Sequence, residues 1–138
     1  MKAKLAVMSL SLGLLAAPAL LLAHHGNAIY DQTKGVTVTG TVTEFLWANP
    51  HCLLNFDVKD DKGNVVKWSG EVGPASDMTR NGWSKKLLKP GDEITVIMTV
   101  AKDGSPIGRI ARLIFMGKTY VGMGNVPEEI IKAGPPKD

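Results

Sequence analysis

The chain has 138 residues, of which 44% are hydrophobic and 21% charged, and its formal net charge is +3 at pH 7. This length and composition fit one globular domain with its own core. Two of the positive charges lie at Lys2 and Lys4, in a segment that we expect to be removed, so the charge gives no support for nucleic-acid binding. Cys52 is the only cysteine, which excludes an intrachain disulfide. It is a small buried hydrophobe, a metal thiolate or one half of an intermolecular bridge.

Residues 1–23 have the layout of a secretory signal peptide, with a basic start, an apolar run and a small residue before polar sequence. Gly13 and Pro18 interrupt the apolar run, which favours a cleaved leader over the alternative of a retained membrane anchor. We expect the cut after Ala23, although Ala19 offers a better small-x-small pattern. The mature chain is then periplasmic or secreted in a bacterial cell, without a membrane attachment.

The expected cut gives a mature chain that begins with His24 and His25, within an N-terminal arm over residues 24–35. A free α-amino group and an imidazole on one residue can chelate a transition metal. With His51, these residues form the candidate metal site, and such a chelate, called a histidine brace, suits copper. The alternative cut would remove the chelate, and a second interpretation is that all three histidines are ordinary polar residues.

The body of the chain, residues 36–121, consists of short segments with the period-2 alternation of half-buried strands, separated by turn residues. On the first segment, Gly40 falls on the apolar face, where it permits strong coiling or a close approach of another backbone. In chain order, we expect strands over residues 36–47, 52–59, 65–72, 93–101, 108–116 and 118–121. A short helix is expected over 75–81, and one or two helical turns over 127–133 within a C-terminal tail, 122–138.

The same alternation assigns side chains to the two faces of the strands. It places His51 on the opposite face of the second strand from Cys52. On the fifth strand, Met116 is expected on the apolar face and Leu113 on the opposite one. The sequence Lys-Pro-Gly-Asp at 89–92, just before the fourth strand, predicts a type II turn.

Five or six strands with a helix between the third and fourth predict an all-β protein. The long first strand with its internal glycine matches an OB-fold-like Greek-key barrel of five to six strands. A small two-sheet sandwich is the alternative architecture.

A second group of residues surrounds Glu71 and Arg80. One interpretation is a buried ion pair between these two residues that locks a loop, with Trp83 filling the interior of the barrel. The other is a ligand groove at the edge of the barrel. That candidate groove consists of Trp47, Asn49, His51, Trp68, Glu71, Arg80 and Trp83.

The chain contains none of the common motifs of a nucleophile with its base, of a redox dithiol, of a zinc protease or of a phosphate-binding loop. We therefore expect that the protein is not an enzyme and assign no catalytic residue.

The sequence resembles the DUF6152 family of small exported bacterial proteins of unknown function. The resemblance covers roughly residues 24–121 and is carried by His24-His25, Trp47-Ala48-Asn49-Pro50-His51, Arg80 with Gly82-Trp83, and Lys89-Pro90-Gly91-Asp92. It implies a small exported all-β protein in which the double histidine accompanies the Asn-Pro-His histidine. This chain departs from the family pattern at Gly26, where serine is usual, and at Cys52, where an aromatic or aliphatic residue is usual. Cys52 is therefore not expected to carry a shared function.

Two hypotheses about function follow. The first is an exported, non-enzymatic binding protein for a small ligand or a periplasmic protein, with neither nucleic acid nor membrane as a partner. The second is a periplasmic copper-binding protein that uses His24, His25 and His51. An oxidative copper enzyme is a third alternative, for which the sequence shows no substrate surface.

Overall fold

The computed structural model describes residue 26 and residues 28–133. The expected leader and two of the three candidate metal ligands, His24 and His25, lie outside the described residues. Within the described part, the chain is mostly β, as the alternation predicts, with six strands and two short helices. Neither of these helices is long and apolar enough to cross a membrane.

The secondary-structure elements follow the order expected from the sequence. In chain order they are β1 (Tyr30–Leu46), β2 (Leu53–Lys59), β3 (Val65–Glu71), α2 (Ala75–Arg80), β4 (Glu93–Ala101), β5 (Ile107–Phe115), β6 (Lys118–Val121) and α3 (Glu128–Ala133). The type II turn before β4 is confirmed, because Gly91 has a φ of 94° and the Asp92 amide donates to the Lys89 carbonyl at 3.1 Å.

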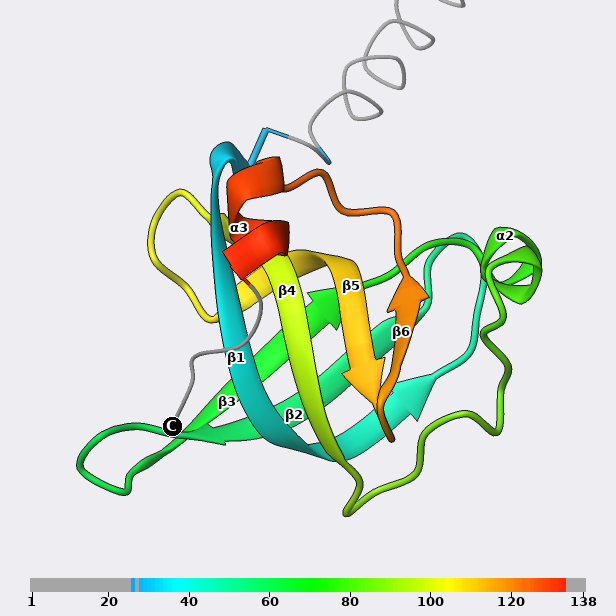
Figure 1. Ribbon diagram of the computed structural model, residues 1–138, viewed down its shortest axis with the longest axis horizontal. Coiled ribbons are helices and arrows are strands. Elements are labelled where there is room, and N and C mark those ends of the chain that lie inside the picture. Colours follow the sequence, from blue (N-terminus) through cyan, green and yellow to red (C-terminus); the bar gives the residue numbers. More distant parts are fainter. Residues whose placement is uncertain (1–25, 27, 134–138) are drawn as a thin grey trace, which may run out of the picture.

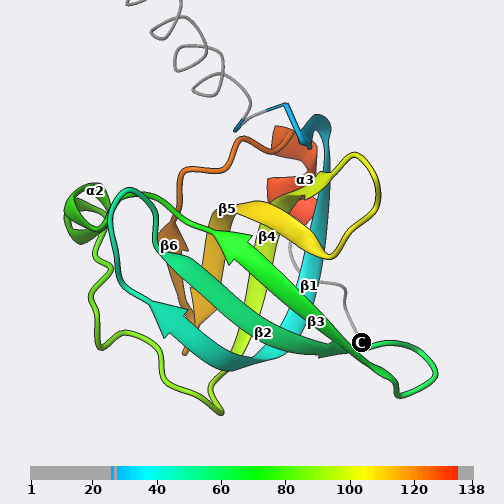
Figure 2. The same ribbon diagram turned by 180° about the vertical axis from the view of Figure 1, so that it is seen from behind.

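All six strands belong to one sheet with the order β3-β2-β1-β4-β5-β6 (Figure 1). Neighbours in this order are antiparallel. In addition, β3 pairs in parallel with β5, with Gly70 opposite Gly108 and Glu71 opposite Arg109. The sheet therefore curls back on itself, and Figure 2 shows β2 and β3 crossing in front of β4 and β5.

The first strand is longer than the sequence predicts. It begins at Tyr30, which lies opposite Ala101 of β4, whereas a strand was expected only from residue 36, after an arm. The register of β1 against β4 shifts between Asp31 and Gly35. At this irregularity the polar residues between Asp31 and Gly35 remain exposed, although they belong to the strand. Because these residues do not alternate with apolar ones, their sequence does not indicate a strand.

A second irregularity redirects the end of β1. The register of β1 against β2 shifts between Val42 and Glu44, which marks a β-bulge. Strict alternation would place Glu44 on the buried face with Val42. The bulge instead brings Phe45 against the core, while Glu44 is exposed and accepts a hydrogen bond from Asn55 Nδ2 at 2.9 Å.

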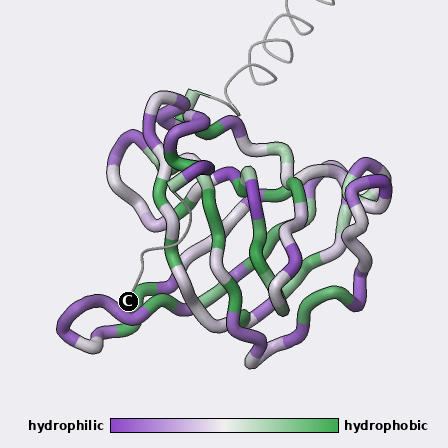
Figure 3. The backbone as a smooth tube through the Cα atoms, in the orientation of Figure 1, coloured by the Kyte–Doolittle hydropathy of each residue, from purple (hydrophilic) through white to green (hydrophobic). Residues whose placement is uncertain are grey.

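The main core occupies the inner face of the curled sheet. Its buried residues are Val42, Cys52, Leu54, Phe56, Val72, Met78, Trp83, Leu88, Ile94, Val96, Met98, Ile110 and Leu113. Figure 3 shows hydrophobic residues concentrated along β4 and β5 and hydrophilic residues at the tip of the β2–β3 hairpin. Buried residues of β1, β2, β4 and β5 and the half-buried Trp68 of β3 meet in this core, so the hydrophobic effect holds the curled sheet together.

The face assignment predicted for β5 holds at Ile110, which is fully buried, and is wrong beyond it. Leu113 is fully buried, whereas Met116, expected on the apolar face, is 87% exposed. The register of β4 against β5 shifts between Ile97 and Met98, which makes Ala111 an extra residue in β5. Beyond this bulge, the residues expected to face the solvent are buried, and those expected to be buried are more exposed. Because β5 has apolar residues on both faces, its sequence does not indicate this change.

The C-terminal segment builds a smaller cluster on the outer face of the sheet. Ile97, Ala111 and Val126 are buried there, with Ile130 and Ile131 of α3 packed against them. Figure 1 shows α3 lying beside the upper part of β1. Part of the expected tail is thus a packed helix that covers β1 and β4.

Candidate functional site

Three side chains from separate segments form a hydrogen-bonded chain at one end of the curled sheet. His51 Nδ1 lies 2.6 Å from Glu71 Oε1, and the Tyr30 hydroxyl donates to Glu71 Oε2 at 3.2 Å. The His51 side chain is 44% exposed and that of Glu71 only 18%, while Tyr30 is buried. The chain therefore runs from the interior to the surface and ends in an accessible imidazole.

The local fold explains why His51 reaches Glu71. The Cys52 amide donates to the Gly73 carbonyl at 2.8 Å, and the Val72 amide donates to the Cys52 carbonyl at 2.9 Å. These bonds extend the β2–β3 pairing beyond the regular strands and set His51 beside the end of β3. The expected opposition of His51 and Cys52 is confirmed, since Cys52 is fully buried and His51 is exposed.

Burial has changed the acidity of two groups near the site. It raises the pKa of Tyr30, and the nearby Glu71 carboxylate and its hydrogen bond raise it further, against the opposing effect of Arg109. Burial also raises the pKa of the Cys52 thiol, although the Ala48 carbonyl, which accepts from Sγ at 3.5 Å, opposes this shift. Tyr30 therefore stays protonated as a donor, and Cys52 stays a thiol rather than a thiolate.

The contact with Glu71 prepares His51 for one kind of chemistry. A carboxylate that accepts from Nδ1–H fixes the tautomer and leaves the Nε2 lone pair available for a metal or a proton. Metal-bound histidines in proteins almost always have such a partner on the other ring nitrogen. The accessible side of His51 can therefore act as a ligand that is already oriented.

The described residues alone do not complete a metal site. Among them, no group of three or more histidine, cysteine, aspartate or glutamate side chains could hold an ion. The other two candidate ligands, His24 and His25, belong to the segment outside the described residues. In the sequence, His25 precedes Tyr30, whose hydroxyl lies at Glu71, by five residues.

The ion pair expected between Glu71 and Arg80 is wrong. Arg80 Nη1 lies 3.3 Å from Asp77 Oδ1, one turn earlier on α2, and both side chains are largely exposed. The helix places these two residues as i,i+3 neighbours, whereas Glu71 has its partners in His51 and Tyr30.

Other residues of the candidate groove have structural contacts. Trp83 is buried, as expected for a core residue, and its Nε1 donates to the Val121 carbonyl at 2.8 Å. Trp47 and Trp68 are half-buried and pack against the main core. Asn49 Oδ1 accepts from the Ala75 amide at 3.0 Å and so fixes the start of α2. Among the described side chains of the predicted set, only those of His51 and Glu71 are joined by a hydrogen bond or an ion pair.

Sequence reasoning missed Tyr30, which supplies the buried end of the hydrogen-bonded chain. The residue lies in the segment interpreted as an arm, where a polar run hides the start of β1. The aromatic residue Tyr30, directly before these polar residues, was the one feature of the sequence that could have indicated the start of the strand.

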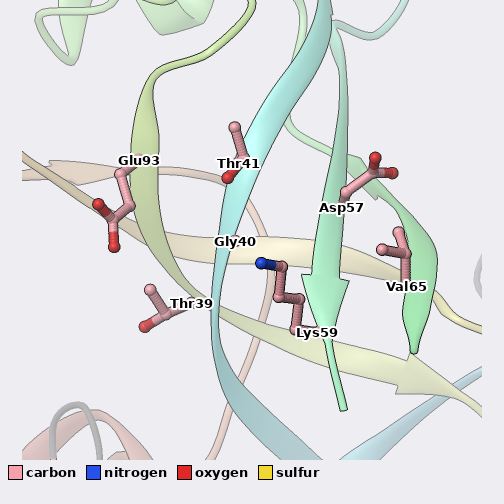
Figure 4. A pocket seen from close by; sticks show the side chains of 7 residues that line it. All are labelled: Thr39, Gly40, Thr41, Asp57, Lys59, Val65 and Glu93. Atoms are coloured by element: carbon pink, nitrogen blue, oxygen red, sulfur yellow. The ribbon is translucent and has the colours of Figure 1, made fainter. Parts of the chain in front are cut away.

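A separate hollow of about 470 Å³ lies over the bend in β1 (Figure 4). It is lined by Thr39, Gly40, Thr41, Asp57, Lys59, Val65 and Glu93. Figure 4 shows the Lys59 side chain extending toward β1 near Gly40. The lining combines hydroxyls with one cation and two carboxylates and has no imidazole or sulfur ligand, so it is chemically distinct from the end of the sheet that carries His51.

Comparison with known proteins gives a family but no activity. A search of curated proteins finds no match. The model of a family of unknown function, DUF6152, matches residues 12–110. The matched region spans all three histidines and Glu71. Because this match covers well over half of the sequence, the chain belongs to the DUF6152 family.

Proposed function

We propose that the protein is an exported, non-enzymatic binding protein whose ligand is a copper ion, held by His51 and by an N-terminal chelate of His24 and His25. The observation that carries the proposal is the 2.6 Å contact between His51 Nδ1 and Glu71 Oε1. It gives the one described histidine the orientation and the carboxylate partner that metal-binding histidines have.

The sequence supplies the remaining ligands. Cleavage after Ala23 in the periplasm exposes the α-amino group of His24, and the amine and the imidazole then bind as a chelate. Nitrogen ligands of this kind favour copper, which also forms the most stable complexes among the divalent first-row metals. The proposed site is thus formed only in the exported chain.

A role in thiol catalysis has little support. Cys52 is the nearest nucleophile in sequence to His51, but its thiol is buried and its pKa is raised. A binding function agrees better with a single oriented imidazole at the surface.

We also propose that the fold is an OB-fold-like Greek-key barrel. The strand order together with the parallel β3–β5 pairing supports a closed ring of β1, β2, β3, β5 and β4, with β6 outside it. In this arrangement the proposed metal site lies at one end of the barrel, where the β1–β2 loop and the first residues of β1 meet.

The test is native mass spectrometry of untagged protein expressed with its own leader and recovered from the periplasm in the presence of copper. We expect a chain that begins at His24 and carries one copper ion. The metal should also stabilise the fold, because a ligand of the native state contributes RT ln(1 + [L]/Kd) to the free energy of unfolding. His51→Ala should abolish both effects.

Glu71→Gln tests whether copper binding depends on the orientation of the His51 imidazole, because the imidazole itself is kept. This substitution keeps the size of the side chain and should weaken copper affinity by about 10- to 100-fold, the usual effect of losing a carboxylate partner. Glu93→Gln is the matched control, because Glu93 is exposed and lies on β4 opposite Thr41 of β1. This change should not alter copper affinity. A chain that begins at Leu20, or one that begins at His24 and binds no copper, would refute the metal site and leave a small ligand or a protein as the partner to identify by pull-down.

A further inference from the structure

The hollow over the bend in β1 lies where β1 and β2 separate. The cross-strand pairs between these strands end at Thr41 and Asp57, whereas β2 continues to Lys59 and β1 stays paired with β4 as far as Tyr30. Thr41 alternates with the buried Val42, so the hollow opens on the outer face of the sheet. Its volume of about 470 Å³ is in the range of sites that bind small molecules.

The register of the strands arranges the polar side chains of the hollow on both sides of β1. Thr41 has Glu93 of β4 on one side and Asp57 of β2 on the other. Lys59 follows Asp57 by two residues and therefore lies on the same face of β2. Figure 4 shows Glu93 on one side of β1 and Lys59 on the other, with the Lys59 amine directed toward β1. A negative and a positive group thus lie on opposite sides of the β1 backbone.

The charged groups of the hollow do not neutralise one another. Within the described part of the chain, no hydrogen bond or ion pair involves the side chain of Asp57, Lys59 or Glu93. Elsewhere on the surface, two lysines pair with carboxylates close by in the sequence, at 3.5 and 3.2 Å. Lys59 has such a carboxylate two residues away, yet its amine is directed toward β1. The cation and the carboxylates are therefore available to a ligand.

This arrangement of charges selects a class of ligand. Lys59 repels a simple cation and the two carboxylates repel a simple anion, whereas a molecule with an ammonium group and a carboxylate at its two ends is attracted by both. Because β2 and β4 flank β1, their backbones are about two strand spacings, or ~10 Å, apart. The two charged groups of a single α-amino acid share one carbon atom and are too close together for this distance. An extended peptide of two or three residues, at about 3.3–3.6 Å for each residue, is long enough.

We propose that this hollow binds a short peptide of two or three residues with both termini free, its carboxylate at Lys59 and its ammonium group at Glu93. The hydroxyls of Thr39 and Thr41, which line the hollow between these charges, can bond to the peptide groups of the ligand. The lining shares no residue with the contact between His51 and Glu71, so peptide binding does not depend on the proposed copper site.

The experiment is an NMR titration of the isotope-labelled, metal-free protein with trialanine, followed through the backbone amide signals. Lys59→Met removes the cation and keeps a long side chain, and Glu93→Gln removes the negative charge at the other end. The matched controls are Lys62→Met at the tip of the β2–β3 hairpin and Glu129→Gln on α3, since both residues are exposed and lie outside the lining. The spread of the amide signals establishes that each variant is folded. Trialanine amide lacks the carboxylate and N-acetyl-trialanine lacks the ammonium group.

We expect saturable shifts centred on residues 39–41 and on Lys59, with binding at least about fivefold weaker in Lys59→Met and in Glu93→Gln and unaltered in the two controls. Wild-type protein should bind trialanine amide about as weakly as Lys59→Met binds trialanine itself. In Lys59→Met, replacing the carboxylate by the amide should make no further difference, and the same holds for N-acetyl-trialanine with Glu93→Gln. No saturable shift at millimolar trialanine, shifts centred on other residues, or equal affinities of wild type and Lys59→Met would each overturn the proposal.

Discussion

Glu71 has a different partner on each of its carboxylate oxygens, and this double contact explains its importance at one end of the sheet. Oε1 faces His51 Nδ1, and Oε2 accepts from the Tyr30 hydroxyl. A largely buried carboxylate needs hydrogen bonds to offset the loss of hydration. Tyr30 therefore stabilises the carboxylate as well as filling space in the interior.

Tyr30→Phe removes this hydrogen bond and keeps the ring. We expect the variant to lose about 1.5–3 kcal/mol of unfolding free energy at pH 7, the range for a hydrogen bond to a charged group. Tyr120→Phe is the control, because the half-buried Tyr120 ring packs on Trp83 and no hydrogen bond of its hydroxyl occurs among the described residues. Urea denaturation measures both. Equal stabilities for the two variants would show that the Tyr30 hydroxyl contributes nothing specific.

The raised pKa of Tyr30 also predicts how stability changes with pH. Burial and the Glu71 carboxylate raise this pKa above the ordinary value of 10.0, so the unfolded chain loses its proton first as pH rises. The stabilisation is complete below pH 10 and is lost as the pH rises through the folded-state pKa. In urea titrations at increasing alkaline pH, the difference in stability between wild type and Tyr30→Phe should therefore shrink. A constant difference would contradict the shift.

At the scale of the elements, β1 takes part in two strand pairs and bends between them. Gly40 lies at the bend, where a Cβ atom would lie 2.6 Å from the Asp57 carbonyl oxygen and 3.0 Å from Phe56 Cδ2. The backbone of β2 thus approaches β1 as closely as the absence of a side chain allows. This approach lets one strand pair with both β2 and β4 while the sheet curls.

Gly40→Ala should therefore destabilise the protein, although alanine normally favours folding over glycine. We expect a loss of about 1–3 kcal/mol in unfolding free energy, as for overpacking elsewhere in protein cores. The control is Thr39→Ala, since Thr39 is exposed and the one hydrogen bond of its hydroxyl within the described part of the chain is to that of Thr95, at 3.0 Å. An increase in the urea midpoint of Gly40→Ala would show that β1 moves away from β2 without cost.

The elements also show what the sequence could predict. Alternation and turn residues locate β2 to β6 because each of these strands has a polar and an apolar face or ends at a clear turn. The bulges near Thr43 and Ala111 follow from pairing between distant segments, which a local pattern does not contain. The site follows the same rule. The sequence analysis assigned His51 and Glu71 to one candidate groove, whereas their contact and the role of Tyr30 depend on the curled sheet.

At the scale of the whole molecule, the C-terminal helix stabilises the strand that carries Tyr30. Val126 and Ile130 approach Gly35 of β1 within 3.2 Å of its Cβ position. Both ends of the described chain are therefore coupled by packing on the outer face of the sheet.

A chain that ends after Asn125 lacks this packing. We expect a melting temperature lower by several degrees, because buried apolar surface on Ile97 and Ala111 becomes exposed. Copper affinity should fall as well, since the start of β1 is less firmly held near Glu71. Glu129→Gln, an exposed change on α3, is the control and should melt like the wild type. An unchanged melting temperature for the truncated chain would show that α3 is dispensable.

The hydrogen bond from Trp83 to the Val121 carbonyl has a consequence for self-association. Strand β6 is the last in the sheet and spans only Lys118–Val121, so its outer side is an edge at which another chain could add a strand. The Val121 carbonyl is already engaged by the Trp83 indole at 2.8 Å and the Asn81 amide at 3.3 Å. An incoming strand would have to displace both donors, one of them buried in the core. Trp83, which fills the interior of the protein, therefore also makes the addition of another chain to the β6 edge less favourable.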